Sequence, residues 1–272
     1  MQTSAQSSFR QRLVSGAFLA GSFVKTPSPH ATEILGNNGF DFIVVDQEHA
    51  PFDRVTTDLV LLAARAAGVA GVVRVPTLTS DAIQASLDCG AVGILAPHVA
   101  SVADAQALVA ACRYRGGKRG FSGVTRAGRY GGSKMWDLVD AADAAVATIA
   151  MIEDPSALAE IDAILAVEGL DAVFIGRGDL TVAFGAPTRD APEVRDAVET
   201  ILRAAKKAGK PVCVMTDNGE ESAGFAERGA SAFILSSDQG FLRKAASEAL
   251  GQMQTARSRV EPPRRAIGDE DP

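Results

Sequence analysis

The stretch that decides the fold is Phe42-Ile43-Val44-Val45-Asp46-Gln47-Glu48-His49-Ala50-Pro51. Its apolar first half, with two β-branched valines, predicts a short buried strand. The strand leads directly into three ionisable side chains, Asp46, Glu48 and His49, and a proline ends the segment. Enzymes of the α/β class carry catalytic groups at such strand ends. A plain loop with solvated acids fits this stretch about equally well, so the other strand ends must decide.

Segments of the same kind recur along the chain. We expect strands at residues 16–24, 42–46, 71–76, 92–97, 148–153, 172–176, 211–215 and 232–235. A helical pattern follows each strand, the last at residues 241–255. Alternating strands and helices imply parallel βαβ units, and eight units close a TIM (β/α)8 barrel. The competing fold, a doubly wound open sheet, is disfavoured because no G-x-G-x-x-G follows the first strand.

We therefore expect a single α/β barrel domain at residues 13–256. Residues 1–12 are polar and predict a frayed N-terminal arm or a short helix. Residues 257–272 are charged and contain prolines, which predicts a disordered tail.

The composition limits the class of protein. The formal net charge is −6, whereas nucleic-acid-binding proteins are usually basic, so we expect no nucleic-acid partner. No apolar run reaches the ~20 residues of a membrane span, and the first residues lack the apolar region of a secretory signal. Three widely spaced cysteines in apolar surroundings predict buried, reduced thiols in a cytoplasmic protein; they are Cys89, Cys112 and Cys213.

Residues 113–132 interrupt the pattern between the fourth helix and the fifth strand. They are rich in glycine and arginine and contain no acid, although the chain as a whole is acidic. Long loops in compact domains are usually functional or disordered. We expect a mobile basic flap that handles an anionic substrate. A solvated loop without such a role is the alternative.

In a barrel, the carboxyl ends of the strands converge on one mouth. Glu153 ends the fifth predicted strand, and Asp179 follows the sixth. Carboxylates from two strands can bind a hard divalent cation such as Mg²⁺ or Mn²⁺. Alternatively, the two acids form buried ion pairs with Arg74 or Arg177. Arg74 could equally hold a substrate carboxylate, because a guanidinium binds carboxylates in a bidentate manner.

A cation, a histidine and an arginine together suit proton abstraction next to a carbonyl. The metal would act as a Lewis acid on that carbonyl. His49, oriented by Asp46, is the candidate base. Gly176 and Gly178 would let backbone N–H groups approach a substrate carboxylate closely, although a simple tight turn explains them too.

Six motifs occur in a fixed order, namely VVDQEHAPFD, VVRVP, LDCGAVGILAPHV, RYRGGKRGFSGVTRAGRYGG, MIED and VEGLDAVFIGRGDL. Each is weak alone, but the set is specific. Over roughly residues 12–250 the chain resembles the class II pyruvate aldolases of the HpcH/HpaI family.

This resemblance implies a barrel enzyme that uses a divalent metal (Mg²⁺, Mn²⁺ or Co²⁺) to cleave 2-oxo-4-hydroxy acids reversibly into pyruvate and an aldehyde. It implies that His49 is the acid/base residue, with Asp46 as its partner, and that Arg74 contacts pyruvate. It implies that Glu153 and Asp179 bind the metal. It also implies that Asp88 approaches the active site of a neighbouring subunit. It places Gly178, Asp179 and Met151 beside the substrate. Members tend to swap their last helix in trimers or hexamers, so a homo-oligomer is expected.

The chain departs from the family pattern at three positions. Met151 replaces a glutamine that contacts the pyruvoyl group, so that hydrogen bond is lost. Arg177 stands in GRGDL where GPxDL is usual, and His98 stands where methionine is usual. We interpret His98 as a hydrogen-bonded wall residue of the mouth. Arg126 and Arg129 of the basic segment would favour an anionic aldehyde.

Three other functions compete with the metal-dependent aldolase. An acyl-CoA lyase of the citrate lyase β-like group shares the metal-enolate chemistry but needs a site for the CoA arm. A Schiff-base aldolase would use Lys25, at the end of the first strand. A non-catalytic binding barrel would leave the histidine, arginine and acids without a purpose.

Overall fold

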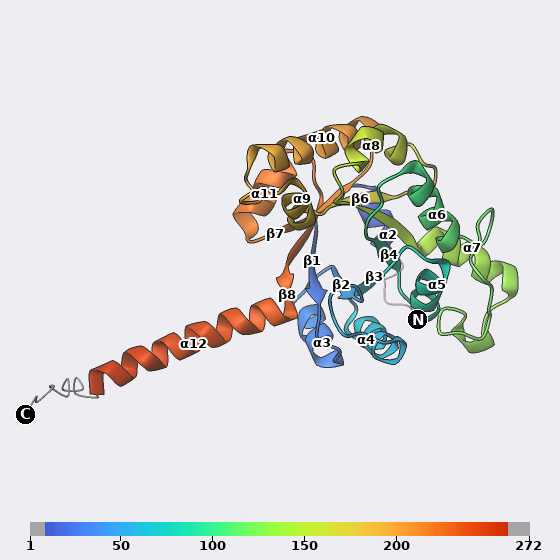
Figure 1. The fold of residues 1–272 in the computed structure, drawn as a ribbon. Coiled ribbons are helices and arrows are strands. Elements are labelled where there is room, and N and C mark those ends of the chain that lie inside the picture. Colours follow the sequence, from blue (N-terminus) through green and yellow to red (C-terminus); the bar gives the residue numbers. More distant parts are fainter. Residues whose placement is uncertain (1–8, 261–272) are drawn as a thin grey trace, which may run out of the picture.

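Eight strands close into a barrel in the computed structural model, which describes residues 9–260 (Figure 1). The strands are β1 Leu19–Val24, β2 Phe42–Asp46, β3 Ala70–Arg74, β4 Gly93–Ala96, β5 Ala147–Ile152, β6 Ala172–Ile175, β7 Val212–Thr216 and β8 Ala232–Ser237. Each strand pairs in parallel with its neighbours in the chain, and β1 closes the ring by pairing with β8. The predicted single-domain TIM barrel is confirmed.

Helices surround this barrel and include two that the sequence patterns did not predict. They are α2 Phe9–Val14, α3 Pro29–Asn37, α4 Arg54–Ala67, α5 Ser80–Asp88, α6 Val102–Cys112, α7 Met135–Ala145, α8 Ala157–Leu165, α9 Arg177–Phe184, α10 Pro192–Ala208, α11 Gly219–Glu227 and α12 Asp238–Val260. A short 3₁₀ turn spans Arg129–Gly131. The unpredicted helices are α7, before β5, and α9, which begins immediately after β6.

Alternate residues of the strands point into the barrel and fill it with apolar side chains. Phe23, Phe42 and Phe174 belong to this inner cluster. A Cβ atom at Gly21 would lie 2.4 Å from the Phe42 ring, so a glycine is needed for that ring to fit. The inner cluster is apolar apart from the buried thiol of Cys213, and charged side chains such as Asp46 and Arg74 lie at the strand ends.

Helix α2 closes the amino-terminal end of the barrel. Its Phe9 is 2 % exposed and its Leu13 is 0 % exposed, and both belong to the inner cluster. The rings of Phe9 and Phe42 are 5.5 Å apart. The expected boundary between an arm at residues 1–12 and the barrel therefore cuts through this helix, and residues 1–8 lie outside the described part.

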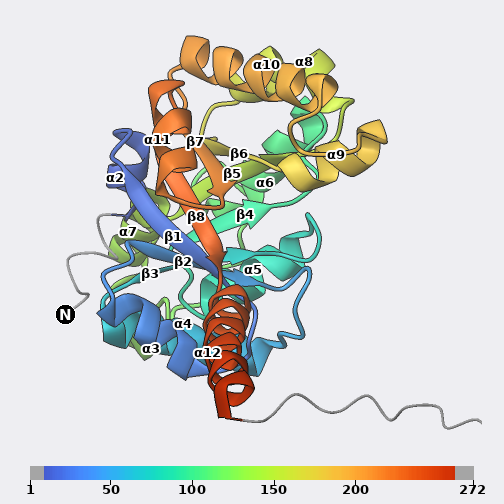
Figure 2. The same ribbon diagram turned by 90° about the vertical axis from the view of Figure 1, so that its left-hand side faces the viewer.

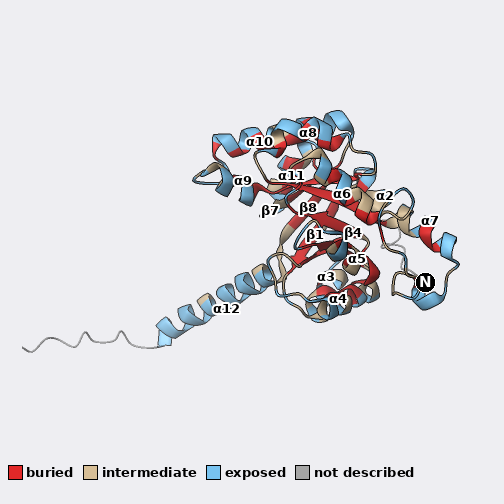
Figure 3. Ribbon diagram, turned by 45° about the vertical axis from the view of Figure 1, so that its right-hand side comes forward, coloured by how far each residue is buried: buried red, intermediate tan, exposed pale blue. Residues whose placement is uncertain are grey.

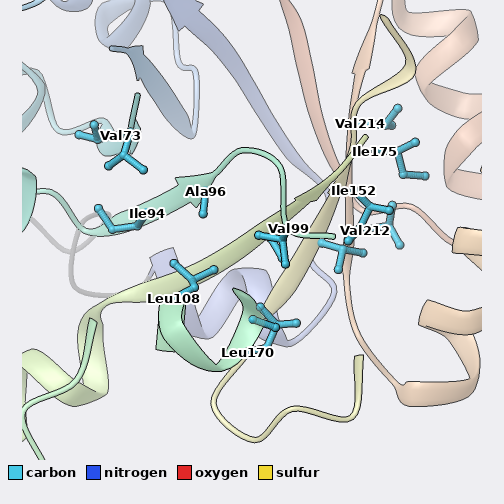
Figure 4. Close-up of a cluster of buried hydrophobic side chains, with 14 of the residues drawn as sticks. Val73, Ile94, Ala96, Val99, Leu108, Ile152, Leu170, Ile175, Val212 and Val214 are labelled. Carbon is cyan, nitrogen blue, oxygen red and sulfur yellow. The ribbon is translucent and has the colours of Figure 1, made fainter. Parts of the chain in front are cut away.

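A second, larger core lies between the strands and the surrounding helices (Figure 4). The strands contribute outward-pointing residues such as Ile94, Ile152 and Val214, and the helices contribute residues such as Leu108. All three cysteines are buried free thiols, as predicted. Burial raises the pKa of Cys112 and of Cys213 to about 12, so both are unreactive packing residues.

The last helix projects away from the barrel. Figures 1 and 2 show α12 leaving at the end of β8, and Figure 3 shows that it is exposed along its length. It has no buried residue, and its ring contact with the barrel is between Phe241 and Phe40 at 6.2 Å. The helix is longer than the predicted 241–255 and includes residues 257–260, which were expected in the disordered tail. Residues 261–272 lie outside the described part.

The basic segment 113–132, which was predicted to be a mobile flap that handles an anionic substrate, lies on the outside of the barrel, away from the mouth of its own chain. It connects α6 to α7 and β5, and connections from a helix to the next strand lie at the end opposite the mouth. Arg126 donates to Asp58 of α4 at 2.9 and 2.5 Å. The N–H of Ala127 donates to the carbonyl of Asp88 on α5 at 3.3 Å. The Arg126 side chain therefore faces the outer helix α4.

Within residues 9–260, no helix is both long enough and apolar enough to cross a membrane.

If α2 is an integral part of the barrel, Phe9→Ala should lower the free energy of unfolding by about 3 kcal/mol, because it empties a closed apolar site. Urea denaturation measures this change. Phe121→Ala is the matched control, since Phe121 is 45 % exposed in the basic segment. Equal losses for the two variants would show that α2 does not close the barrel.

Candidate active site

The carboxyl ends of the strands form a mouth that contains a cavity of about 220 Å³. Residues from six strands or the turns after them line it, namely Phe23, Lys25, Arg74, Met151, Phe174, Ile175, Gly176, Arg177, Gly178, Asp179, Met215 and Ser237. The set includes seven of the residues singled out in the sequence, which are Lys25, Arg74, Met151, Gly176, Arg177, Gly178 and Asp179. Convergence of polar groups from different strands is typical of active sites in this fold.

A fully buried carboxylate, that of Asp46, holds two cations at the mouth. Arg74 donates to it in a bidentate manner, from Nε at 3.0 Å and from Nη2 at 2.7 Å. The Lys25 ammonium lies 3.1 Å from Asp46 Oδ2. Burial alone would raise the pKa of Asp46, but the bonds from Arg74 and from the His49 N–H lower it below its usual value. Asp46 is therefore an ionised anchor that joins the ends of β1, β2 and β3.

His49 is oriented differently from the prediction. Its hydrogen bond to Asp46 comes from the backbone N–H, at 3.1 Å, and its imidazole Nε2 lies 3.7 Å from Glu48 Oε2. Glu48 also lies 3.3 Å from Arg74 Nη1 and 3.8 Å from His98 Nε2. Glu48, rather than Asp46, is thus the acid next to the His49 ring, and it connects both histidines to Arg74.

Glu153 and Asp179 form the second charged group of the mouth. Glu153 is 2 % exposed. Burial and the adjacent Asp179 raise the pKa of Glu153 to about 7, although the N–H of His98, which donates to Glu153 Oε1 at 2.8 Å, opposes the shift. A buried carboxylate whose pKa is raised by burial and by a neighbouring acid gains from a nearby cation, and carboxylate oxygens are the donors that a hard divalent cation prefers.

The predicted alternative, in which arginines neutralise these two acids, is wrong. Arg74 uses its guanidinium on Asp46 and Glu48. Arg177 lies 2.7 Å from Glu221 through Nη1 and donates to the carbonyl of Met215 at 2.7 Å through Nη2.

His98 lies at the mouth with a strained backbone. Its φ is 53°, in the left-handed region that non-glycine residues rarely adopt. Its Nδ1 lies 3.1 Å from Asp154 Oδ2. Partial burial opposes protonation of the ring, but the bond to Asp154 and the charges of Glu153 and Glu48 raise its pKa. The strain keeps the His98 N–H on Glu153, which agrees with the predicted wall residue.

The turn after β6 brings backbone close to the acids. A Cβ atom at Gly176 would lie 2.8 Å from Glu153 Oε2, so only glycine fits beside this carboxylate. Helix α9 begins at the next residue, and its first N–H groups, including those of Gly178 and Asp179, have no partner within the helix. Met151, 3 % exposed, forms the apolar floor beside them.

Comparison with known proteins assigns this site to a family. The model of the HpcH/HpaI aldolase/citrate lyase family matches residues 19–245. The chain belongs to this family.

Its relatives within the family are enzymes that make or break carbon–carbon bonds. A 5-keto-4-deoxy-D-glucarate aldolase of Enterobacter sp. (strain 638) is 35 % identical over 239 residues, which cover 87 % of this chain and 93 % of the relative. A pyruvate aldolase of Rhizobium etli is 36 % identical over 210 residues, covering 76 % and 82 %. The crystal structure of an HpcH/HpaI aldolase/citrate lyase family protein from Burkholderia cenocepacia J2315 superposes with a TM-score of 0.87 at 30 % identity, covering 91 % and 99 %. The chain is accordingly a carbon–carbon lyase.

One residue that the HpcH/HpaI resemblance assigns to the site lies far from this mouth. Asp88 is the last residue of α5, at the opposite end of the barrel, and is 8 % exposed. Its Oδ1 lies 3.8 Å from Arg119 Nη2. Burial raises the pKa of Asp88 even though Arg119 opposes the shift. Within one chain, Asp88 is therefore not part of the constellation at the mouth.

Sequence reasoning missed two contacts at the mouth. Glu48 was noted at the strand end, but its place between His49, His98 and Arg74 depends on how the turn after β2 folds back. Lys25 was considered only as a Schiff-base residue, whereas its ammonium pairs with Asp46. The signal for this position is the alternation of side chains at the end of β1. Because Phe23 points into the barrel and Val24 points outward, Lys25 is expected on the inner side, at the mouth.

Asp46→Asn should destabilise the protein by about 3 kcal/mol, because it leaves Arg74 and Lys25 without their buried partner. The effect should depend on pH. The folded pKa of Asp46 is lower than its ordinary value of 3.8, so its ionised form stabilises the protein above about pH 4, and this stabilisation is lost as the pH falls through the folded value. Denaturation at several pH values should show a constant difference between variant and wild type from pH 8 to about pH 5 and a shrinking one below. A difference that grows in acid would contradict the assignment.

Proposed function

We propose that this protein is a divalent-metal-dependent class II aldolase that cleaves 2-oxo-4-hydroxy acids reversibly into pyruvate and an aldehyde. The observation that carries the proposal is the pairing of the buried Glu153 with the exposed Asp179, at the same mouth as the Asp46–Arg74 ion pair, in a family whose relatives are aldolases. Oxygen donors of this kind suit Mg²⁺, Mn²⁺ or Co²⁺.

Glu153 and Asp179 would hold the cation. Within residues 9–260 no group of three or more acidic, histidine or cysteine side chains is arranged as a metal site. Magnesium is commonly bound by one or two carboxylates, with water and substrate as the other ligands, so a two-carboxylate site is sufficient. When bound, the metal supplies Lewis-acid polarisation of the 2-oxo group.

The chain itself supplies the binding groups for the 2-oxo acid. The first N–H groups of α9, at Gly178 and Asp179, are free to donate to the substrate carboxylate, and the positive end of the helix dipole favours this anion. Arg74 lies in the same cavity, and Asp46 and Phe23 hold its guanidinium in place. Arg74 thereby stabilises the negative charge that develops on the pyruvate oxygen during cleavage.

His49 carries the proton transfer in this proposal. In the cleavage direction, the imidazole accepts the proton of the 4-hydroxyl group, the bond between C3 and C4 breaks, and C4 leaves as the aldehyde. The electron pair of that bond stays on the pyruvate fragment as its enolate, and protonation at C3 gives pyruvate. Glu48 Oε2 lies 3.7 Å from the imidazole Nε2 and is the acid that orients this ring. Met151 in place of glutamine leaves an apolar wall on one side of the pyruvate site.

An acyl-CoA lyase is the second candidate, because the family model also covers citrate lyases. Such an enzyme would release an acyl-CoA thioester instead of a free aldehyde. Release of acetyl-CoA from a thioester substrate such as citramalyl-CoA, without cleavage of 4-hydroxy-2-oxo acids, would favour it.

Removal of metal is the first test. EDTA should abolish pyruvate release from 4-hydroxy-2-oxo acids, and Mn²⁺ or Mg²⁺ should restore it, because the carbonyl is otherwise not polarised. Glu153→Gln should lower kcat at least about a hundredfold even in saturating metal. Glu33→Gln, at an exposed position on α3, is the matched control and should keep full activity. Full activity in EDTA would overturn the metal assignment.

We further propose that the protein is a homo-oligomer, a trimer or hexamer, in which α12 packs on another subunit. Helix α12 exposes Leu242, Leu250 and Met253, and an isolated helix with such a surface is not stable in water. Asp88 would then approach the mouth of a neighbouring subunit. Its Oδ1, together with Nε and Nη1 of Arg119, is buried without a hydrogen-bond partner among the described residues. Buried polar atoms normally find a partner, and a second subunit would supply one.

Complementation tests this arrangement. His49→Asn and Asp88→Asn should each be inactive alone, whereas co-expression of both should restore about a quarter of the activity, because a quarter of the sites in a mixed oligomer carry both native residues. Light scattering on the same samples gives the oligomeric state. A monomer, or an inactive mixture of oligomers, would contradict the proposal.

A further inference from the structure

Lys25 is the cation of the mouth whose hydrogen-bonding capacity is least used. It follows the last residue of β1, and its side chain is 28 % exposed. Its ammonium has three N–H donors, and Asp46 is its ion-pair partner among the described residues. Arg74 is 6 % exposed and contacts two carboxylates, and Arg177 is held by Glu221 and a backbone carbonyl. Two donors of Lys25 therefore remain for a ligand.

Asp46 does not depend on Lys25 for its charge. Its Oδ1 accepts from Arg74 Nε and from the His49 N–H, and its Oδ2 accepts from Arg74 Nη2 at 2.7 Å. Of the groups that lower the pKa of Asp46, Lys25 contributes least. The main role of this ion pair is therefore that Asp46 orients the Lys25 ammonium, because Asp46 stays ionised through its other hydrogen bonds.

Lys25 and the proposed pyruvate-binding groups lie on different sides of one cavity. The cavity is lined by Lys25 from the end of β1 and by Gly178 and Asp179 after β6. In the closed ring, two strands, β7 and β8, separate β1 from β6. A substrate whose 2-oxo acid lies at the start of α9 would direct its far end across the mouth toward Lys25.

The backbone that carries Lys25 is fixed by the start of α12. Asp238 accepts from the N–H of Lys25 at 2.8 Å and from the N–H of Thr26 at 3.0 Å. The side chain of Gln239 donates to the carbonyl of Lys25 at 3.4 Å. A lysine fixed at its backbone and oriented by a buried acid loses little further freedom when it binds an anion.

We propose that Lys25 is a specificity-determining residue that binds a carboxylate at the aldehyde end of the substrate. The inference rests on the proposed function, since it presumes a 2-oxo acid at the start of α9. The sequence suggested that Arg126 and Arg129 produce a preference for acidic substrates, but their segment lies against the outer helices. The proposal assigns this preference to Lys25, a residue of the mouth.

The first test compares two substrates that differ at the aldehyde end. This end carries a carboxylate in 4-hydroxy-2-oxoheptanedioate (the acidic substrate) and is uncharged in 4-hydroxy-2-oxopentanoate (the neutral substrate). Lys25→Met keeps the apolar stem and removes the charge. It should lower the ratio of kcat/KM for the acidic over the neutral substrate by about tenfold to a hundredfold, mainly through KM of the acidic one. Lys25→Arg should keep most of the ratio. Lys207→Met, at an exposed surface ion pair, is the matched control and should leave the ratio unchanged.

Other roles of Lys25 give other results. If Lys25→Met lowers kcat/KM equally for both substrates, the lysine acts by positioning Asp46, and the proposal is overturned. Irreversible inactivation of the wild type by borohydride in the presence of pyruvate, absent in Lys25→Met, would make it a Schiff-base residue and would overturn it as well.

A binding experiment separates the proposal from the proposed function. Calorimetry with 2-oxoheptanedioate and with 2-oxoheptanoate compares ligands that differ only in the remote carboxylate, which lies at the same carbon as in the acidic substrate. The wild type should bind the diacid about tenfold or more tightly than the monoacid, and Lys25→Met should lose this difference. If the wild type cleaves no 4-hydroxy-2-oxo acid, the aldolase assignment fails, but this preference still decides the role of Lys25. Equal binding of both ligands by the wild type would falsify the proposed role of Lys25.

Discussion

The mouth of this barrel depends on one buried negative charge, the carboxylate of Asp46. An ionised acid without contact with water is costly unless it is paired and hydrogen-bonded, and here Arg74, Lys25 and a backbone N–H meet that need. These partners come from the ends of β1 and β3, on either side of the strand that carries Asp46, and from the turn after β2. A single anion therefore fixes the relative positions of the arginine, the lysine and the histidine-bearing turn.

Much of the fold could be predicted from the sequence because barrel strands are short, apolar and regularly spaced. The eight strands and the closure between β1 and β8 follow from that pattern. A short helix was one of two alternatives for the N-terminal residues, and the sequence left the choice open because Phe9 and Leu13 are the only buried residues of α2, too few for a periodic signal. The length of α12 was underestimated because its charged end carries no apolar pattern, and charge without periodicity indicates disorder as readily as a solvated helix.

The residues at the strand ends were also predictable, but their pairing was not. The alternation of strands and helices brings Arg74, Met151 and Asp179 to the cavity, with Glu153 beside them. Which acid meets which base depends on the turns, where one residue of offset changes the partner. The sequence therefore suggested Asp46 for the His49 ring, whereas Glu48 lies next to it. The basic segment was assigned to the wrong end because its composition was considered before its position between a helix and the following strand.

The junction between β8 and α12 divides the last helix into two parts with different constraints. Asp238 and Gln239, its first two residues, bind the backbone of the β1 turn, so their identity is tied to the mouth of the barrel. Beyond Phe241 the helix has no buried residue, and its side chains Leu242, Leu250 and Met253 are exposed. Natural variation in this helix is thus expected to be uneven. The outer turns can diverge with the mode of assembly, while the first turn can change only together with the chemistry of the site.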